Sequence, residues 1–293
     1  MYARLFTIIA PLLISAAVGF VWARSGRPFD TRFVTRLIMD VGMPFLIVSS
    51  LATTDVERGA LTDVGLAVVC LLAAMVLIGF LLLRLLRMDV RAFLPSILFP
   101  NTGNMGLPLC LFAFGREGLS LGLVVFVTVS IVHFTFGVAL VSGSAHPARF
   151  VANPIVWSTA IGAVILLADW ELPAWVANTT DIMAGLTIPL MLLTLGVSLA
   201  NLKVHAAAKS AILAAARLGI GFGVGLLAAH VFGLSGVARG VVVLQATMPV
   251  AVFNYLLAER YGREPDAVAG AVVGSTIASF VTLPLLLWYL LAG

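Results

Sequence analysis

The sequence has little charge and almost no cysteine. Of its 293 residues, 10% are charged and 61% are hydrophobic, so there is too little polar surface to cover a water-soluble domain. The two cysteines, Cys70 and Cys110, both lie in apolar segments. This excludes a disulfide framework and a cysteine metal cluster, and no motif implies a cofactor. The composition predicts an integral membrane protein.

The apolar segments are each about twenty residues long, which is the length of a helix that crosses a bilayer. An outer-membrane barrel would instead show short strands of alternating hydrophobicity. We therefore expect an all-α membrane protein with ten transmembrane helices. The first segment is counted as a helix and not as a cleaved signal peptide, because its apolar run is long and no A-x-A site follows. The expected helices span residues 5–23, 32–53, 63–85, 92–114, 119–141, 154–169, 173–200, 206–232, 236–258 and 267–291.

The net charge of +4 comes from basic residues in short loops, a pattern typical of membrane topology and not of nucleic-acid binding. One set of alternate loops carries twelve Lys and Arg residues and the other set carries four. The excess of positive charge marks the cytoplasmic side, so we expect both termini on the non-cytoplasmic side of the cell (inner) membrane. The twelve are Arg24, Arg27, Arg32, Arg36, Arg84, Arg87, Arg91, Arg149, Lys203, Lys209, Arg260 and Arg263.

The two halves of the chain are similar to each other. The segment "DVGMPFLIVSSLA" (40–52) aligns with "GLTIPLMLLTLGV" (185–197), with an offset of 145 between their prolines. The near-constant spacing of further proline pairs indicates an internal duplication. These pairs are Pro11 with Pro154 at an offset of 143, and Pro100 with Pro249 at an offset of 149.

Each half holds five expected helices, and an odd number makes the second copy enter the membrane from the opposite side. We predict two inverted five-helix repeats, residues 1–145 and 146–293, as in many secondary transporters. Pro100 and Pro249 lack an N–H and interrupt the fourth and ninth helices near mid-membrane. Because an unpaired carbonyl is costly in hydrocarbon, we expect the broken helices to cross and to line a cavity.

Polar residues cluster at both breaks. The helix that starts after a break has free N–H groups and a positive dipole end, which favour an anion. Gly103 and Gly106 would let a ligand approach the backbone closely. The alternative is that the amide side chains only cap half-helices and bridge neighbouring helices. The substrate-binding candidates are Pro100, Asn101, Thr102, Asn104, Gln245, Pro249 and Asn254.

Three ionisable residues within the expected helices are candidates for coupling or charge balance. Asp40 is either a proton carrier or an interfacial acid paired with Arg36. His133 is either a proton shuttle or a hydrogen-bonded packing residue. Arg217 either balances an anion or a buried acid, or extends its side chain to the cytoplasmic interface. These residues leave the coupling ion open.

Three segments resemble the auxin efflux carrier family, which includes plant auxin exporters and bacterial carriers of small dicarboxylates such as malonate and malate. They are "PNTGNMGLPL" (100–109), "QATMPVAVFNYLLAERYG" (245–262) and "VVGSTIASFVTLPLLL" (272–287). The resemblance implies a scaffold of helices 1, 2, 6 and 7 and a transport part of helices 3–5 and 8–10 that moves like an elevator. It also implies a substrate carboxylate at the crossover, held by Asn101.

The sequence departs from the plant members of that family at two points. The residue after the second crossover proline is usually polar in plant members, and here it is Val250. The long hydrophilic central loop of many plant exporters is also absent, because residues 142–150 are all that links the halves. The compact bacterial members are therefore the better match.

We expect a secondary active transporter of small organic anions that works by alternating access. An enzyme is not expected, because the sequence has no H-E-x-x-H motif and no pair of intramembrane aspartates. The alternatives are an ion-coupled carrier of another small solute, and a channel or sensor on the same scaffold. The expected partners are the organic anion, the lipid bilayer, a proton or sodium co-ion, and a second copy of the chain in a homodimer.

Overall fold

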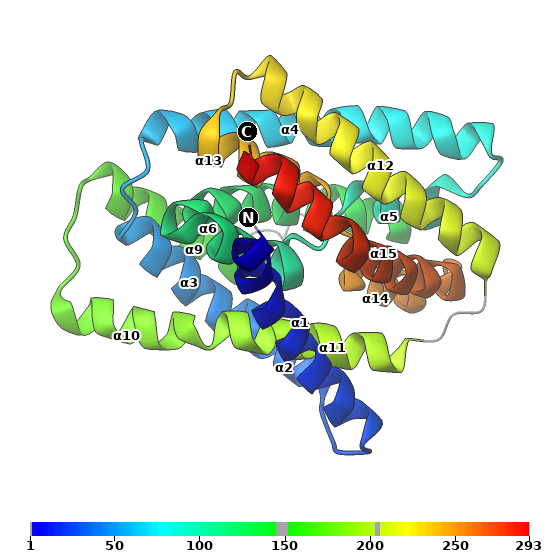
Figure 1. The fold of residues 1–293 in the computed structure, drawn as a ribbon, viewed down its shortest axis with the longest axis horizontal. Coiled ribbons are helices and arrows are strands. Elements are labelled where there is room, and N and C mark those ends of the chain that lie inside the picture. Colours follow the sequence, from blue (N-terminus) through cyan, green and yellow to red (C-terminus); the bar gives the residue numbers. More distant parts are fainter. Residues whose placement is uncertain (1, 145–151, 203–205, 293) are drawn as a thin grey trace.

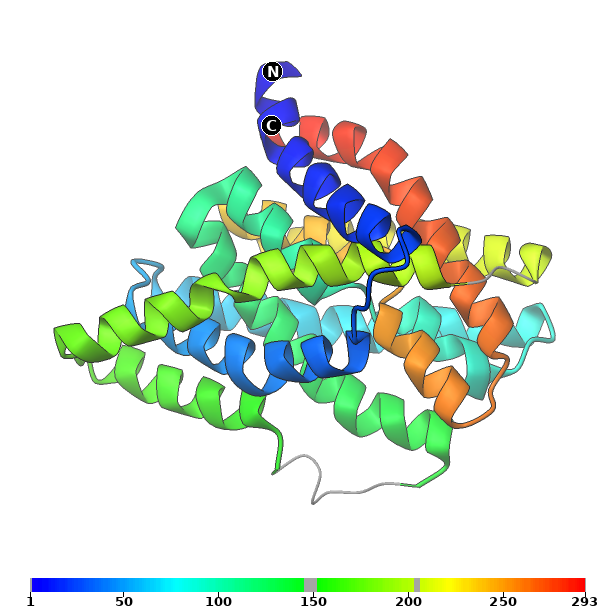
Figure 2. The same cartoon turned by 90° about the horizontal axis from the view of Figure 1, so that it is seen from below.

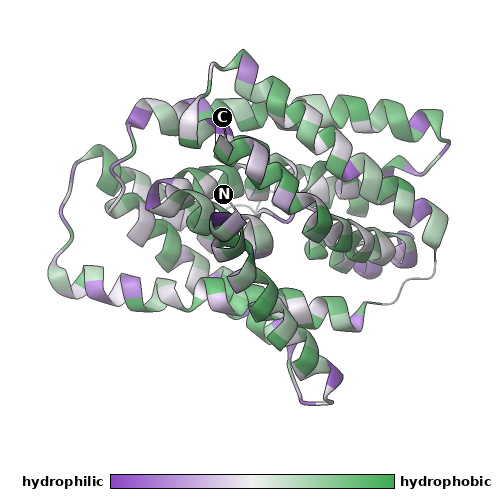
Figure 3. Ribbon diagram, in the orientation of Figure 1, coloured by the Kyte–Doolittle hydropathy of each residue, from purple (hydrophilic) through white to green (hydrophobic). Residues whose placement is uncertain are grey.

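The computed structural model describes residues 2–144, 152–202 and 206–292, and all of their regular elements are helices (Figure 1). Seven helical segments within these ranges are long and apolar enough to cross a membrane. Hydrophobic residues follow the helices, and hydrophilic residues gather near helix ends and in loops (Figure 3). The expected all-α, multi-pass membrane fold is confirmed, whereas the repeat arrangement stays a prediction.

The helices lie close to the expected ranges. The described part of the first half contains α1 (Tyr2–Arg24), α2 (Thr31–Leu37), the π-helical turn η1 (Ile38–Gly42), α3 (Met43–Ala52), α4 (Arg58–Leu85), α5 (Val90–Leu98), η2 (Thr102–Gly106), α6 (Leu107–Val132), η3 (His133–Gly137) and α7 (Val138–Ser142). The described part of the second half contains α9 (Pro154–Leu167), α10 (Ala174–Gly185), α11 (Thr187–Asn201), α12 (Ala207–Val231), α13 (Gly236–Ala246), α14 (Val252–Arg260) and α15 (Pro265–Ala292).

A glycine divides the long segment from η2 to α7. Gly115 has φ 68° and ψ −155°, a non-helical conformation that glycine adopts without the steric cost of a Cβ. The segment therefore turns between residue 114 and residue 116. This agrees with the two separate helices expected at 92–114 and 119–141.

One group of helices packs through small residues. Helix α1 lies against α11, and α3 packs against α9 and α10. A Cβ added at Gly19 would collide with the carbonyl group of Leu193, and one at Gly196 would collide with the carbonyl group of Ala16. Close approach of two helix backbones at small residues is the usual way that helices associate in a membrane.

A second group surrounds α12. This helix packs against α4, α13 and α15, while α4 also contacts α5 and α6. The start of α1 and the end of α15 lie near each other in both ribbon views (Figure 2). This placement is consistent with both termini on one side of the membrane.

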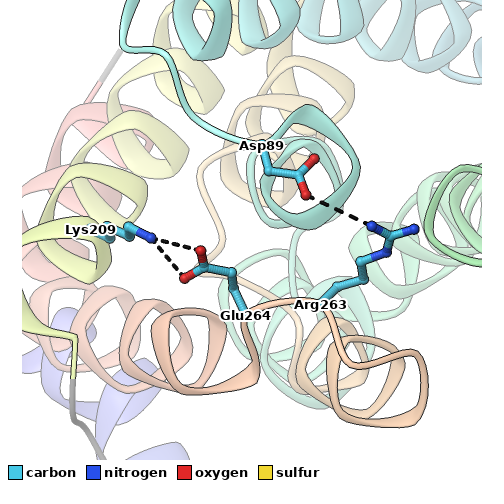
Figure 4. Close-up of polar contacts among 4 residues, drawn as sticks. All are labelled: Asp89, Lys209, Arg263 and Glu264. Atoms are coloured by element: carbon cyan, nitrogen blue, oxygen red, sulfur yellow. Dashed lines mark hydrogen bonds and ion pairs between the residues drawn. The ribbon is translucent and has the colours of Figure 1, made fainter.

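Ion pairs join the ends of three helices within the second group (Figure 4). Lys209 at the start of α12 bonds both carboxylate oxygens of Glu264, at 2.7 and 2.8 Å. Arg263 lies 4.0 Å from Asp89, which also caps the start of α5 by accepting the Arg91 N–H. All of these side chains are partly exposed, so each pair contributes little to stability.

Candidate functional site

Two helices are interrupted at prolines, as expected from their missing N–H groups. The first break lies between the end of α5 at Leu98 and the start of η2 at Thr102. The second lies between the end of α13 at Ala246 and the start of α14 at Val252. Pro100 and Pro249 occupy the middle of the two breaks.

The two breaks cross and pair with each other. Pro100 and Val250 form an antiparallel bridge. The Asn101 N–H donates to the Pro249 carbonyl oxygen at 2.7 Å, and the Ala251 N–H donates to the Phe99 carbonyl oxygen at 3.2 Å. Each break thus supplies partners for the backbone groups that the other leaves free, which non-helical backbone at membrane depth requires.

A cavity of about 760 Å³ lies beside this crossover. Its lining comes from the two breaks with parts of η2, α6, η3 and α14, and from α2, η1 and the second half of α11. Arg32, Arg36 and Arg260 line it as well, and all three belong to the loops expected on the cytoplasmic side. The cavity therefore reaches the end of the molecule that the charge distribution assigns to the cytoplasm.

Four of the substrate-binding candidates line the cavity: Pro100, Asn101, Thr102 and Asn104. The Asn101 side chain is 5% exposed, and its Nδ2 atom has no hydrogen-bond partner among the described residues. A buried donor without a partner is costly, and because this atom has almost no accessible surface, the amide must turn toward the cavity to bind a ligand or water there.

The other three candidates are not part of the cavity lining. Asn254 is buried, and its Nδ2 donates to the Phe99 carbonyl oxygen at 3.1 Å. Gln245 is fully buried against η2, where a Cβ added at Gly106 would collide with its amide. Pro249 contributes its carbonyl oxygen to the pairing of the breaks. Asn254 nevertheless lies next to the cavity, because its side chain interacts with that of His133 in the lining.

His133 lines the cavity, and its ring packs against neighbouring aromatic side chains. Its ring stacks on Phe99 with a centroid distance of 3.9 Å and meets the edge of Phe253 at 5.2 Å. The Nε2 atom is buried without a hydrogen-bond partner in the described part of the chain. His133 therefore fits the packing alternative, and the Asn254 side chain lies close enough to interact with its ring.

The other two ionisable candidates lie elsewhere. Asp40 is exposed in η1, outside the cavity wall, and within the described ranges no ion pair joins it to Arg36. Arg217 is completely buried. The expectation that Arg217 extends to the cytoplasmic interface is wrong, because its guanidinium points inward to carbonyl groups at the ends of α5 and α13.

Sequence reasoning missed the part of the cavity lining that α11 contributes. Thr194 and Ser198 of α11 line the cavity, and the Thr194 hydroxyl has no partner among the residues that the structure describes. Their spacing of four residues places both hydroxyl groups on one face of the helix that contains Pro189. The sequence alone could have shown this polar face. Of the basic residues counted for topology, Arg149 and Lys203 lie outside the described residues.

Comparisons with known proteins point to membrane transport. A family model described as "Membrane transport protein" matches residues 4–150 and 140–287. An uncharacterized transporter of Methanothermobacter thermautotrophicus is 28% identical over 269 residues, which cover 87% of this chain and 88% of that protein. Auxin efflux carrier component 1 of Arabidopsis thaliana is 30% identical over 153 residues, covering 50% of this chain but only 24% of the plant protein. A probable auxin efflux carrier component 1b of Oryza sativa subsp. japonica is 27% identical over 154 residues, with 50% and 27% covered.

Proposed function

Because this chain belongs to the membrane transport protein family, which includes the auxin efflux carriers, we propose that it is a secondary transporter of small organic anions. Its family is one of transporters and not of enzymes. The substrate class that we propose is carboxylates, including dicarboxylates such as malonate or malate and auxin-like acids.

The observation that carries the proposal is the unpaired amide of Asn101 in the cavity wall. The Nδ2 atom is a donor and suits a carboxylate oxygen, and the Thr194 hydroxyl on α11 offers a second donor. Both η2 and α14 begin at the crossover, so the positive ends of their dipoles lie there. Neutral donors bind an anion and release it again more readily than a fixed ion pair does.

The basic residues at the cavity's open end support an anionic cargo. Arg32, Arg36 and Arg260 line it together with a single acid, Glu259. A cleft lined by an excess of one charge raises the local concentration of the opposite ion. We therefore propose that these arginines attract the substrate from the cytoplasmic side.

The transport mechanism that we propose is an elevator within two inverted repeats, residues 1–145 and 146–293. Helices α1, α2, α3, α9, α10 and α11 form the scaffold, and the other helices form the transport part. The cavity lies between α2 and α11 on one side and the crossover on the other, as a site between these two parts requires. This conformation is then inward-open, with both termini on the non-cytoplasmic side.

The energy source follows from the charge of the cargo. Export of an anion can run on an inside-negative membrane potential, which supplies about 2.3 kcal/mol per charge per 100 mV. Import would need a co-transported cation, for which a proton and sodium are the candidates. Under the same proposal a homodimer is the expected assembly.

Counterflow in proteoliposomes tests the proposal. We expect saturable uptake of labelled malonate or malate that is accelerated by unlabelled carboxylate inside the vesicles. A channel would show flux without saturation and without counterflow, and this result would contradict a carrier. Run with several mono- and dicarboxylates, the same assay defines the cargo.

Asn101→Ala tests the site. We expect roughly tenfold weaker carboxylate binding, the loss of one hydrogen bond to a charged group, with a nearly unchanged melting temperature because the Nδ2 atom has no protein partner. Asn178→Ala is the matched control, since Asn178 is exposed on α10 away from the cavity. Unchanged affinity in Asn101→Ala would remove this residue from the site.

A further inference from the structure

The guanidinium of Arg217 lies where both broken helices end. On α12 the side chain is completely buried, and its Nη1 donates to the carbonyl oxygens of Ile97 and Leu98, the last residues of α5. The second helix contributes in the same way. Nη2 donates to the carbonyl oxygen of Ala246, the last residue of α13, and Nε donates to that of Met248 at 3.2 Å.

The charge of Arg217 is balanced by backbone carbonyls and not by an acid. The buried polar residues of the described chain include no Asp or Glu, and no ion pair there involves Arg217. A helix C-terminus carries roughly half a negative charge, so the ends of α5 and α13 together supply about one. The partial negative charges of the two helix ends therefore balance the single positive charge of the guanidinium.

A glycine on the same helix face makes room for this arrangement. Gly221 lies one turn after Arg217, and a Cβ added there would collide with the Ala246 carbonyl oxygen and with the guanidinium itself. At Gly225, one turn further on, an added Cβ would lie 2.8 Å from the Ala246 Cβ. The backbone of α12 thus lies close enough to the end of α13 for the Arg217 guanidinium to bond the Ala246 carbonyl oxygen.

In transporters with broken helices, carbonyls of unwound backbone and half-helix C-terminal ends are the groups that hold a coupling cation. Here the same kinds of group are bonded to a side chain. We propose that the Arg217 guanidinium is a resident cation: it fills a cation site formed by the ends of α5 and α13, and it cancels the negative charge of these helix ends, which would otherwise repel an anion in the cavity. The second part rests on the proposed function, whereas the first does not.

The cation site is tested without any substrate. Purified full-length Arg217→Ala should leave the carbonyls unpaired, so millimolar guanidinium or sodium chloride should raise its melting temperature above that in choline chloride at equal ionic strength. The wild type should show no such difference, because its site is filled. Arg239→Ala is the control, since Arg239 is partly exposed and donates to the Tyr289 hydroxyl. No cation-specific shift in Arg217→Ala, or an equal shift in the wild type, would overturn the site.

The effect of Arg217 on anion binding is tested by comparing the affinities of a dianion and a monoanion. Without the guanidinium, the helix ends leave about one uncompensated negative charge, which repels a dianion about twice as strongly as a monoanion. A tenfold loss of malonate affinity in Arg217→Ala should therefore accompany only about a threefold loss for the malonate monomethyl ester. Guanidinium should restore both affinities. A merely structural role would lower the two affinities by the same factor, and this result would refute the electrostatic part.

Two further variants keep the test decisive if Arg217→Ala does not fold. Arg217→Lys retains the charge, so the ratio of malonate to monoester affinity should stay near the wild-type ratio. Arg217→Gln removes the charge and should lower that ratio. An equal ratio in both variants would refute the proposal. If the wild type binds neither carboxylate, the proposed function fails, while the melting experiment still decides on the cation site.

Discussion

The Asn254 side chain donates a hydrogen bond from Nδ2 to the carbonyl oxygen of Phe99, at 3.1 Å and across 155 residues of sequence. The same carbonyl oxygen accepts the Ala251 N–H from the second break. A side chain of α14 therefore reinforces the backbone pairing of the two breaks. The crossover is held from both halves of the chain.

Asn254→Ala should destabilise the protein by about 1–3 kcal/mol, because it removes the amide donor from a buried carbonyl group. Thermal unfolding in detergent measures the change, with Asn178→Ala as the control at an exposed position. A melting temperature equal to that of the wild type would mean that the side-chain bond adds nothing to the backbone pairing.

Neutralising the cavity's open end should slow substrate entry. Arg36→Gln removes one positive charge from the cavity lining, so we expect initial uptake at low substrate concentration to fall several-fold at low ionic strength. The difference from the wild type should shrink as salt is added, because salt screens exposed charges. Arg116→Gln, outside the cavity lining, is the control. A salt-independent defect would argue against steering.

The crossing of α1 and α11 should tolerate no side chain at Gly196. Gly196→Ala places a Cβ against the Ala16 carbonyl group, so the helices must separate, at a cost of about 1–3 kcal/mol. Gly223→Ala is the matched control, because a Cβ at Gly223 of α12 meets no atom within 4 Å. Equal melting temperatures for the two variants would contradict the packing argument.

An ion pair on the expected non-cytoplasmic side joins the two proposed parts. Arg58 at the start of α4 bonds Asp169 at 2.5 Å and the Leu166 carbonyl oxygen at 3.0 Å, both just at the end of α9. Asp169→Asn should shift the population away from the inward-open state by a factor of about two to five, since exposed pairs contribute under about 1 kcal/mol.

Thiol labelling measures that shift. In a Cys70→Ser background, Ser198→Cys places a thiol in the cavity wall. A membrane-impermeant reagent on the cytoplasmic side should then label it more slowly when Asp169→Asn is added, and Arg116→Gln should leave the rate unchanged. Equal labelling with and without Asp169→Asn would mean that the ion pair does not favour this state.

The helix positions could be predicted because they depend on local properties of the chain. The apolar run at 5–23 is α1, and the run at 206–232 is α12, since burying twenty apolar residues in lipid is decided by those residues alone. Pro100 and Pro249 mark the breaks for an equally local reason, the missing N–H. The π-helical turns η1 and η3 inside the second and fifth expected helices needed the structure.

The assignment of polar residues to the cavity could be predicted only in part. Asn101 and Asn254 look alike in sequence, as amides just after a break, yet one lines the cavity and the other bonds Phe99. The direction in which each side chain points depends on how the helix that follows the break is rotated about its axis. Thr194 lines the cavity from α11, and in the sequence only its spacing of four residues from Ser198 marks it.

The sequence by itself determined that this is an all-α membrane protein with proline breaks in two helices, because hydrophobicity and a missing N–H act within a single segment. Only the tertiary structure decided that the breaks pair with each other and that Arg217 turns inward instead of toward the interface. Its carbonyl partners at Ile97 and Leu98 lie about 120 residues earlier in the chain. Such contacts form only when the folded helices bring their ends together.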